Sequence, residues 1–130
     1  MAISVKLRVL EGVYGIARLG PTEPFPAWAD GEGFVSISRS PDELSIVCLE
    51  NRIVAGVQKD GGWTGFQLVG PFAFGETGII LSVIRPLSEE GIGVFVVSTF
   101  DGDHLLVKQE DASRVMRLLS EAGHVIGTIG

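Results

Sequence analysis

The chain has 130 residues, of which 45% are hydrophobic and 20% charged, with a net charge of -6 at neutral pH. This length favours one compact unit or two very small ones that share a core, and the apolar fraction excludes intrinsic disorder. The acidic balance argues against a nucleic-acid or anionic-membrane surface, because both partners are polyanions. The one cysteine, Cys48, cannot form an internal disulfide, and no apolar run has the roughly 18 residues of a spanning helix. The sequence therefore predicts a cytoplasmic protein.

The first half alternates apolar and polar residues over short segments, which is typical of strands with one buried face. Strands are expected at 5–9, 13–19, 34–38 and 44–48. Three prolines in the segment 21–26 exclude a regular helix there, so only a helical turn is expected at Ala27–Ala29. A further extended piece over 53–59 is expected to end at Asp60-Gly61-Gly62.

The second half is more regular and predicts two amphipathic helices among four strands. The expected order is a strand at 63–69, a helix at 77–90 that contains Pro86, a strand at 94–98, a strand at 105–107, a helix at 110–122 and a strand at 124–126. Asp101-Gly102 predicts the hairpin turn between the two middle strands. This strand–helix–strand–strand–helix–strand order is the α+β, ferredoxin-like βαββαβ pattern.

The first half contains a reduced copy of the second. An offset of 60 residues places Phe34 on Val94 and Glu50 on Glu110. Both segments are a strand, a short acidic turn, a strand and a glutamate at a helix start. We therefore predict an internal repeat with a degenerate first half at 1–61 and a complete second half at 62–130.

Catalysis finds little support, since none of the common nucleophile, phosphate-loop or zinc motifs occurs. Cys48 lies between apolar neighbours and is expected to be a buried structural thiol. The densest polar group is Asp101, Asp103 and His104. It admits three interpretations: a solvated hairpin turn, a metal site, or a pair of carboxylates that hold an ammonium group.

A second candidate site is the start of the first long helix, at 74–79. Free backbone N–H groups at a helix N-terminus favour an anion, and glycines allow it to approach closely. A carboxylate bound there and an ammonium bound near Asp101 or Asp103 would suit a free amino acid. The alternative is that Glu76 or Thr77 caps the helix and Gly75 makes the bend.

Several segments resemble small bacterial proteins with tandem ACT domains, a subfamily that includes the cytosolic arginine sensors of animals. The resemblance runs from about Tyr14 to Val125. It rests on the segments 26–29, 34–48, 96–108 and 122–124. It implies a βαββαβ fold in each half with two sheets side by side, although the proline-rich segment 21–26 departs from the long first helix of such domains.

The resemblance also implies that small ligands, usually amino acids, bind where ACT modules meet. The loop from the first strand to the first helix and the loop after the second strand contact the ligand in such domains. These loops map here to Gly75, Glu76, Thr77, Gly78, Ile79, Ser98, Thr99, Phe100, Asp101 and Asp103. A non-catalytic amino-acid sensor without a cofactor is the function expected on this basis. The competing hypothesis is an association module that forms a homodimer or binds a partner protein and has no ligand.

Overall fold

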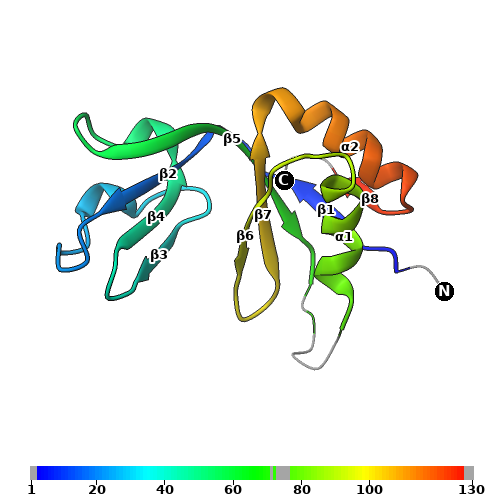
Figure 1. Ribbon diagram of the computed structural model, residues 1–130, viewed down its shortest axis with the longest axis horizontal. Coiled ribbons are helices and arrows are strands. Elements are labelled where there is room, and N and C mark those ends of the chain that lie inside the picture. Colours follow the sequence, from blue (N-terminus) through cyan, green and yellow to red (C-terminus); the bar gives the residue numbers. More distant parts are fainter. Residues whose placement is uncertain (1–2, 71, 73–76, 128–130) are drawn as a thin grey trace. The chain divides into compact units, whose positions relative to one another are not determined.

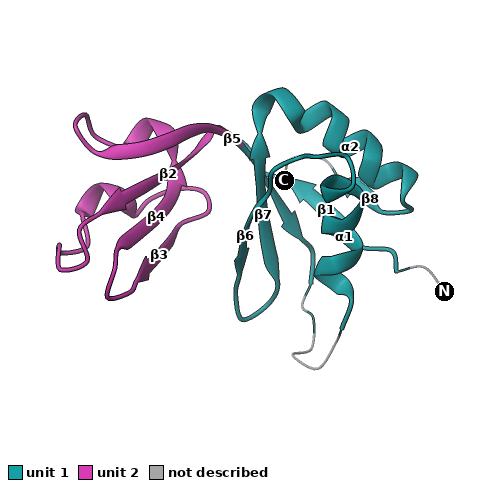
Figure 2. Ribbon diagram, viewed as in Figure 1, with its two compact units in different colours: residues 1–11, 64–130 teal, residues 12–63 magenta. Residues whose placement is uncertain are grey.

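The computed structural model describes residues 3–70, 72 and 77–127, and it divides the chain into two compact units (Figure 2). Unit 1 comprises residues 1–11 and 64–130, and unit 2 comprises residues 12–63. Unit 2 is therefore inserted into unit 1 between its first strand and the rest. Within the described residues, no helix combines the length and apolar character needed to cross a lipid bilayer.

Unit 2 is a four-stranded antiparallel sheet with two single 3-10 turns (Figure 1). Its strands are β2 (Tyr14–Leu19), β3 (Ser36–Arg39), β4 (Leu44–Leu49) and the first part of β5 (Gln58–Leu68), in the spatial order β3-β4-β2-β5. The 3-10 turns are Ala27–Ala29 and Glu50–Arg52. The strands expected at 13–19, 34–38 and 44–48 and the single turn after the proline-rich segment are confirmed. The extended piece expected over 53–59 is wrong for most of its length, because residues 53–57 form a turn and β5 begins at Gln58. The core includes Ala17, Leu44, Ile46 and Cys48.

In unit 2, the side chain of Arg52 anchors the segment between β2 and β3, where the chain forms a 3-10 turn and no long helix. Arg52 donates its guanidinium N–H groups to three backbone carbonyls, those of Trp28 at 3.2 Å, Ala29 at 3.2 Å and Glu32 at 2.8 Å. These charge-assisted hydrogen bonds satisfy carbonyls that no helix or strand ladder serves. They fix the segment after the prolines against the end of β4.

The break expected at Asp60-Gly61-Gly62 is wrong, because β5 runs through it as one strand of 11 residues. Glu50 explains why glycines stand inside this strand. Its Oε1 accepts a hydrogen bond from the Gly62 N–H at 2.8 Å, and a Cβ on Gly61 would lie 1.6 Å from the same oxygen. The register between β2 and β5 shifts between Tyr14 and Ile16, which accommodates the irregularity. The glycines make room for a carboxylate and do not end the strand.

Unit 1 is a mixed sheet with two helices. Its strands are the second part of β5, β1 (Lys6–Val9), β6 (Phe95–Ser98), β7 (Asp103–Lys108) and β8 (Val125–Gly127), in the order β6-β7-β5-β1-β8. The helices are α1 (Ile79–Ser88) and α2 (Ala112–Glu121), the latter entered through a 3-10 turn at Gln109–Asp111. All elements expected in the second half are present, with α1 two residues shorter at each end than the predicted 77–90.

Both helices pack on one face of the unit 1 sheet (Figure 1). Val83 and Leu87 of α1 and Val115 and Leu119 of α2 are fully buried, and so are the strand residues that face them. These residues are Val5, which directly precedes β1, and the strand residues Leu7, Phe66, Leu68, Leu105 and Val107. Burial of large aliphatic and aromatic side chains stabilises a fold by about 1.5–3 kcal/mol each. This cluster therefore supplies most of the stability of unit 1.

Pro86 lies inside α1, where it removes the backbone N–H that would bond to the Ser82 carbonyl one turn earlier. The structure replaces that donor with a side chain. His124 Nε2 lies 2.9 Å from the Ser82 carbonyl oxygen, and its Nδ1 accepts a hydrogen bond from the Val5 N–H at 3.0 Å. His124 is only 4% exposed. The imidazole thus connects α1 to β1 and fixes the position of its single proton on Nε2.

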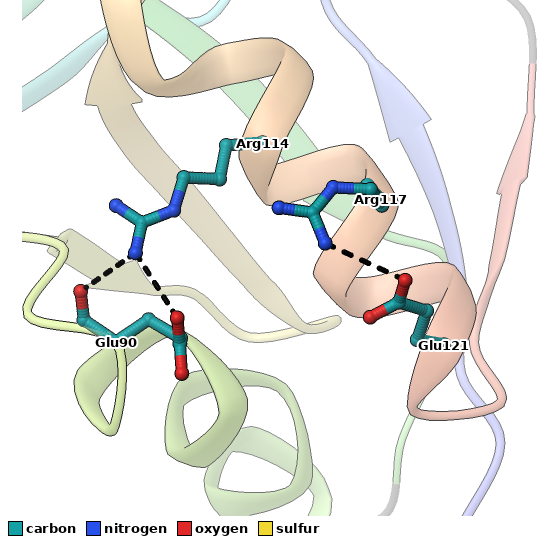
Figure 3. Close-up of polar contacts among 4 residues, drawn as sticks. All are labelled: Glu90, Arg114, Arg117 and Glu121. Carbon is teal, nitrogen blue, oxygen red and sulfur yellow. Dashed lines mark hydrogen bonds and ion pairs between the residues drawn. The ribbon is translucent and has the colours of Figure 1, made fainter.

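The two helices are also joined at their surface (Figure 3). Arg114 Nη2 lies 3.1 Å from both the backbone oxygen and the Oε1 of Glu90, just after the end of α1. Arg117 and Glu121 form a second ion pair at 3.4 Å within α2. Both pairs are solvent-exposed, and such pairs contribute about 0–1 kcal/mol. The apolar core, and not these ion pairs, decides how the helices pack.

The two units repeat one strand plan. The elements of unit 2 follow in the order strand, 3-10 turn, strand, strand, 3-10 turn, strand. From β5 onward, unit 1 has the same order with a helix in the place of each turn. Strand β5 serves as the last strand of the first copy and the first strand of the second. The prediction of halves at 1–61 and 62–130 differs from this division at the N-terminus. Strand β1 pairs with β5 and β8 inside unit 1, because Val5 and Leu7 complete the core beneath the helices.

Candidate functional site

The candidate site begins on the face of the unit 1 sheet that the helices leave open. Side chains alternate between the two faces of a strand. Leu7, Leu68 and Leu105 point to the helices, so Arg8, Gln67 and His104 point to the opposite face. Their strands β1, β5 and β7 are neighbours in the sheet, and Arg8 stands directly opposite Gln67 in the ladder. One polar side chain from each of three adjacent strands therefore lies in a row.

The hairpin turn between β6 and β7 closes the end of this face. The Ser98 hydroxyl donates a hydrogen bond to Asp103 Oδ1 at the last paired position of the hairpin. The Thr99 N–H bonds to the Gly102 carbonyl at 2.7 Å, and the Thr99 hydroxyl donates to the same oxygen at 3.0 Å. These bonds hold the turn in one shape. Phe100, at its tip, is 78% exposed.

Glycine at position 70 brings the end of β5 against this turn. A Cβ there would lie 2.6 Å from the Asp101 carbonyl oxygen, a distance that real side chains do not reach. The same oxygen accepts a hydrogen bond from the Phe72 N–H at 3.2 Å. The backbone of Asp101 is thus fixed by the strand end. The exposed side chain of Asp101 lies beside the row formed by Arg8, Gln67 and His104.

These elements enclose a cavity of about 400 Å³, which we call the hairpin cavity. It is lined by Arg8, Gln67, Leu68, Val69, Gly70, Thr99, Asp101, Gly102 and His104. All of these residues belong to unit 1. A volume of this size lies within the range of about 300–1,000 Å³ of small-molecule sites.

Opposite charges line the hairpin cavity. Arg8 Nη1 donates to Gln67 Oε1 at 3.4 Å, which engages one of the five N–H donors of the guanidinium. Asp101 supplies a carboxylate from the turn. Burial lowers the pKa of His104 below its usual value, and the nearby Asp103 carboxylate opposes this shift in part. The imidazole is therefore neutral at pH 7, so the described residues that line the cavity carry one permanent cation, Arg8, and one carboxylate, Asp101.

The residues predicted from the sequence fall into separate places. Gly75 and Glu76 lie outside the described residues. Thr77 is exposed, and Gly78, with a φ of 81°, is the left-handed residue before α1. Ile79 begins α1 and packs against the unit 1 core.

Gly78 lines a second cavity of about 420 Å³, whose other described lining residues are Ile3, Leu81, Ser82, Arg85, Pro86, Glu89 and Ala122. In the predicted turn, Thr99 and Asp101 line the hairpin cavity, Ser98 and Asp103 bond to each other, and Phe100 projects outward. Of the predicted residues that the structure describes, Gly78 lines the second cavity, Thr99 and Asp101 line the hairpin cavity, and the others line neither.

The metal interpretation of the turn gains no support from the geometry. Among residues 3–70, 72 and 77–127, no three or more His, Cys, Asp or Glu side chains gather as a metal ion would require. The predicted burial of Cys48 is confirmed. Burial raises the pKa of its thiol, with a partial opposing effect of Arg52.

Sequence reasoning missed Arg8 and Gln67 as members of a site and considered His104 only as a metal ligand. The alternation of Lys6 and Arg8 with Leu7 and Val9 does indicate that Arg8 lies on an outer face. Nothing local in the sequence shows that β1 inserts between β5 and β8. That insertion is what brings Arg8 to Gln67.

Two protein-family models match the chain. A model for a separate N-terminal domain matches residues 12–55, and a model described as an ACT domain matches residues 58–121. The first match lies within unit 2. The second begins in β5 and ends in α2, so it covers most of unit 1.

The chain is similar both to solved structures and to named proteins. A crystal structure of a protein from Agobacterium tumefaciens is 60% identical and has a TM-score of 0.94, with 99% of this chain and 96% of that chain covered. The human protein named Cytosolic arginine sensor for mTORC1 subunit 1 is 30% identical over 108 residues, which are 83% of this chain. This chain spans about 30% of the length of that relative.

The regulatory subunit of aspartate kinase from Thermus thermophilus, in its ligand-free form, is 11% identical with a TM-score of 0.61 and shares the fold. The match covers 94% of this chain and 99% of that one. The strand plan, the matched domain model and these relatives agree. The chain therefore belongs to the ACT-domain family, with an ACT domain preceded by a distinct N-terminal domain and related to the cytosolic arginine sensors.

Proposed function

We propose that this protein is a non-catalytic regulatory protein of the cytosol that binds a free amino acid in the hairpin cavity. The observation that carries the proposal is the presence of Arg8 and Asp101 in the lining of one cavity. A zwitterion needs a cation for its carboxylate and an anion for its ammonium. Arginine presents a planar fork that binds a carboxylate through two parallel hydrogen bonds. Asp101 receives the ammonium group.

The family relationship supports the same class of ligand. The printed name of the human relative assigns arginine sensing to that protein. ACT-domain relatives with regulatory roles support a regulatory role here, and the absence of catalytic motifs in the sequence supports a non-catalytic one. Binding of a ligand at such a site changes the protein by stabilising the arrangement that binds it better.

The test is a thermal-unfolding screen of all twenty amino acids with ligand-free protein. A ligand that binds only the folded state stabilises it by about 2.7 kcal/mol at one hundred times its Kd. We expect at least one amino acid to raise the Tm. Arg8→Met and Asp101→Asn should each abolish the rise, since each removes one of the two charges.

Matched controls separate binding from general stability. Lys6→Met removes a cation from the same strand two residues away, outside the cavity lining. Asp42→Asn removes a carboxylate from the equivalent turn of unit 2. Both variants should keep the ligand-induced rise. A screen in which no amino acid changes the Tm of the unaltered protein would contradict the proposal.

The second candidate is an association module that forms a homodimer or binds a partner protein. The feature that favours it is the apolar rim of the second cavity, where Leu81 is 52% exposed and Ile3 is 37% exposed. If the protein is a dimer whose mass in solution is unchanged by Leu81→Glu, this surface does not form the dimer. If no added amino acid changes that mass, the ligand does not control assembly. A Leu81→Glu variant that becomes monomeric would support association through α1.

A further inference from the structure

Gln67 and Arg8 form a cross-strand pair in which the Gln67 amide has only one possible orientation. The two residues stand directly opposite each other on β5 and β1, and both line the hairpin cavity. Arg8 Nη1 donates a hydrogen bond to Gln67 Oε1 at 3.4 Å. A guanidinium has donors and no acceptor, so only the oxygen of the amide can face it. The amide nitrogen Nε2 therefore points away from the guanidinium.

The two N–H groups on Gln67 Nε2 are available to a bound molecule. The side chain is half-buried, and the bond to Arg8 is the one polar contact that it makes within the described part of the chain. Gln67 Oε1 is already engaged, so this side chain offers the cavity donors rather than an acceptor. Donors in the wall of a cavity favour a ligand group that only accepts hydrogen bonds.

We infer that Gln67 is a specificity-determining residue that, together with Arg8, selects a free α-carboxylate over an amidated one. The inference rests on the proposed amino-acid site and adds the residue that distinguishes the acid end of the ligand. A carboxylate has two acceptor oxygens, which take the guanidinium fork of Arg8 and a further N–H from Gln67 at once. An α-carboxamide or a peptide bond turns an N–H group toward these donors and leaves hydrogen bonds unmade. The ligand class is thus a free amino acid and not a peptide.

A glutamine suits this role because it orients Arg8 without neutralising it. Among the described residues, Arg8 forms no ion pair, so its positive charge remains for a ligand. A glutamate at position 67 would have nearly the same shape, but its carboxylate would pair with the guanidinium. It would also repel a ligand carboxylate. The uncharged amide avoids both effects.

Two substitutions of nearly equal size test the role of Gln67. We would measure Kd by calorimetry at pH 7.0 for each amino acid that raises the Tm and for its α-carboxamide. In the unaltered protein the free acid should bind about tenfold tighter or more than the carboxamide. Gln67→Met removes the donors and should raise the Kd of the acid about tenfold.

Gln67→Glu should reverse the preference instead of only weakening it. Like charges brought together oppose binding strongly, so the Kd of the acid should rise about a hundredfold or more. The carboxamide carries no carboxylate, and its Kd should rise by less than about threefold. A loss of structure would raise both Kd values equally, so the ratio of the two reports the contact itself. The Tm of the ligand-free variant should not fall, because the new carboxylate lies opposite Arg8.

Unit 2 supplies a matched control on the same strand. Gln58 of β5 stands opposite Arg18 of β2, which repeats the arginine–glutamine pair of unit 1. Gln58 is exposed and lies outside the lining of the hairpin cavity. Gln58→Glu makes the same change of charge beside an arginine. It should leave both Kd values unchanged.

The outcomes separate this inference from the function on which it rests. If an amino acid binds the unaltered protein no more tightly than its carboxamide does, the inference is overturned and the amino-acid site stands. Equal rises of both Kd values in Gln67→Glu, or no rise in either variant of Gln67, would overturn it in the same way. If no amino acid binds the unaltered protein, the proposed function fails and the inference fails with it.

Discussion

His104 is the residue whose surroundings decide most about the candidate site. It extends from β7 onto the open face of the sheet, where burial disfavours the charged imidazolium and Asp103 favours it. Burial has the larger effect, so the pKa of His104 in the folded protein lies below that of the unfolded chain. The unfolded state therefore takes up a proton at a higher pH than the folded state does.

This difference predicts an acid-sensitive contribution to stability. The free energy of unfolding falls as pH decreases from about 7 through the lowered pKa of His104, because the unfolded state binds more protons over that range. His104→Asn cannot titrate and should lose this part of the pH dependence. Thermal unfolding of both proteins between pH 8 and pH 5 measures it. Parallel Tm curves for the two proteins would contradict the assignment to His104.

At the scale of elements, helix α1 depends on a residue from the other end of its unit. Pro86 takes away the donor for the Ser82 carbonyl, and His124 Nε2 replaces it while its Nδ1 serves Val5. The sequence predicts a helix containing Pro86 with a kink or a tightened last turn. It does not predict that a histidine next to β8 completes the hydrogen bonding of that helix.

A double-mutant cycle tests this replacement. His124→Ala leaves two buried backbone groups without a partner and should lower the free energy of unfolding by about 2–4 kcal/mol. Pro86→Ala restores an N–H opposite Ser82, so in the His124→Ala background it should recover about 1 kcal/mol more than it adds to the unaltered protein. Urea unfolding gives all four values. Strictly additive effects would mean that Ser82 does not connect the two residues.

At the scale of the molecule, the insertion of unit 2 separates β1 from the rest of its sheet by some fifty residues of chain. Strand β1 nevertheless lies between β5 and β8, and the Leu10 N–H bonds to the Gly65 carbonyl at 2.8 Å. The two strands are antiparallel where the chain leaves and re-enters unit 1. A tight turn would therefore suffice to join them.

We expect unit 1 to fold without the insertion. Residues 1–11 joined to 64–130 by Asn-Gly, a sequence suited to a two-residue hairpin, should unfold cooperatively and retain its helical circular dichroism. Residues 62–130 alone lack β1, so β5 and β8 lose their common neighbour and the core loses Val5 and Leu7. That fragment should show no cooperative transition. Cooperative unfolding of 62–130 would contradict the role given to β1.

Local pattern was sufficient for most elements and insufficient for the bounds of β5. Period-two and helical spacings predicted the strands and both helices, because side-chain alternation and helix amphipathicity are properties of contiguous residues. By themselves, the glycines at 61 and 62 predict a strand end. Their actual role depends on the Glu50 carboxylate, which comes from another element.

The sequence by itself determined the α+β class, the repeat and the acidic hairpin turn, since each depends on residues close together in the chain or on similarity between segments. Only the tertiary structure decided that β1 enters the sheet of unit 1 and that Arg8, Gln67 and His104 form one row. The reason is that strand order is set by which apolar faces complete a common core. Residues up to 96 positions apart meet through that order alone, so the composition of the cavity follows from the packing of Leu7 and Val5 beneath the helices.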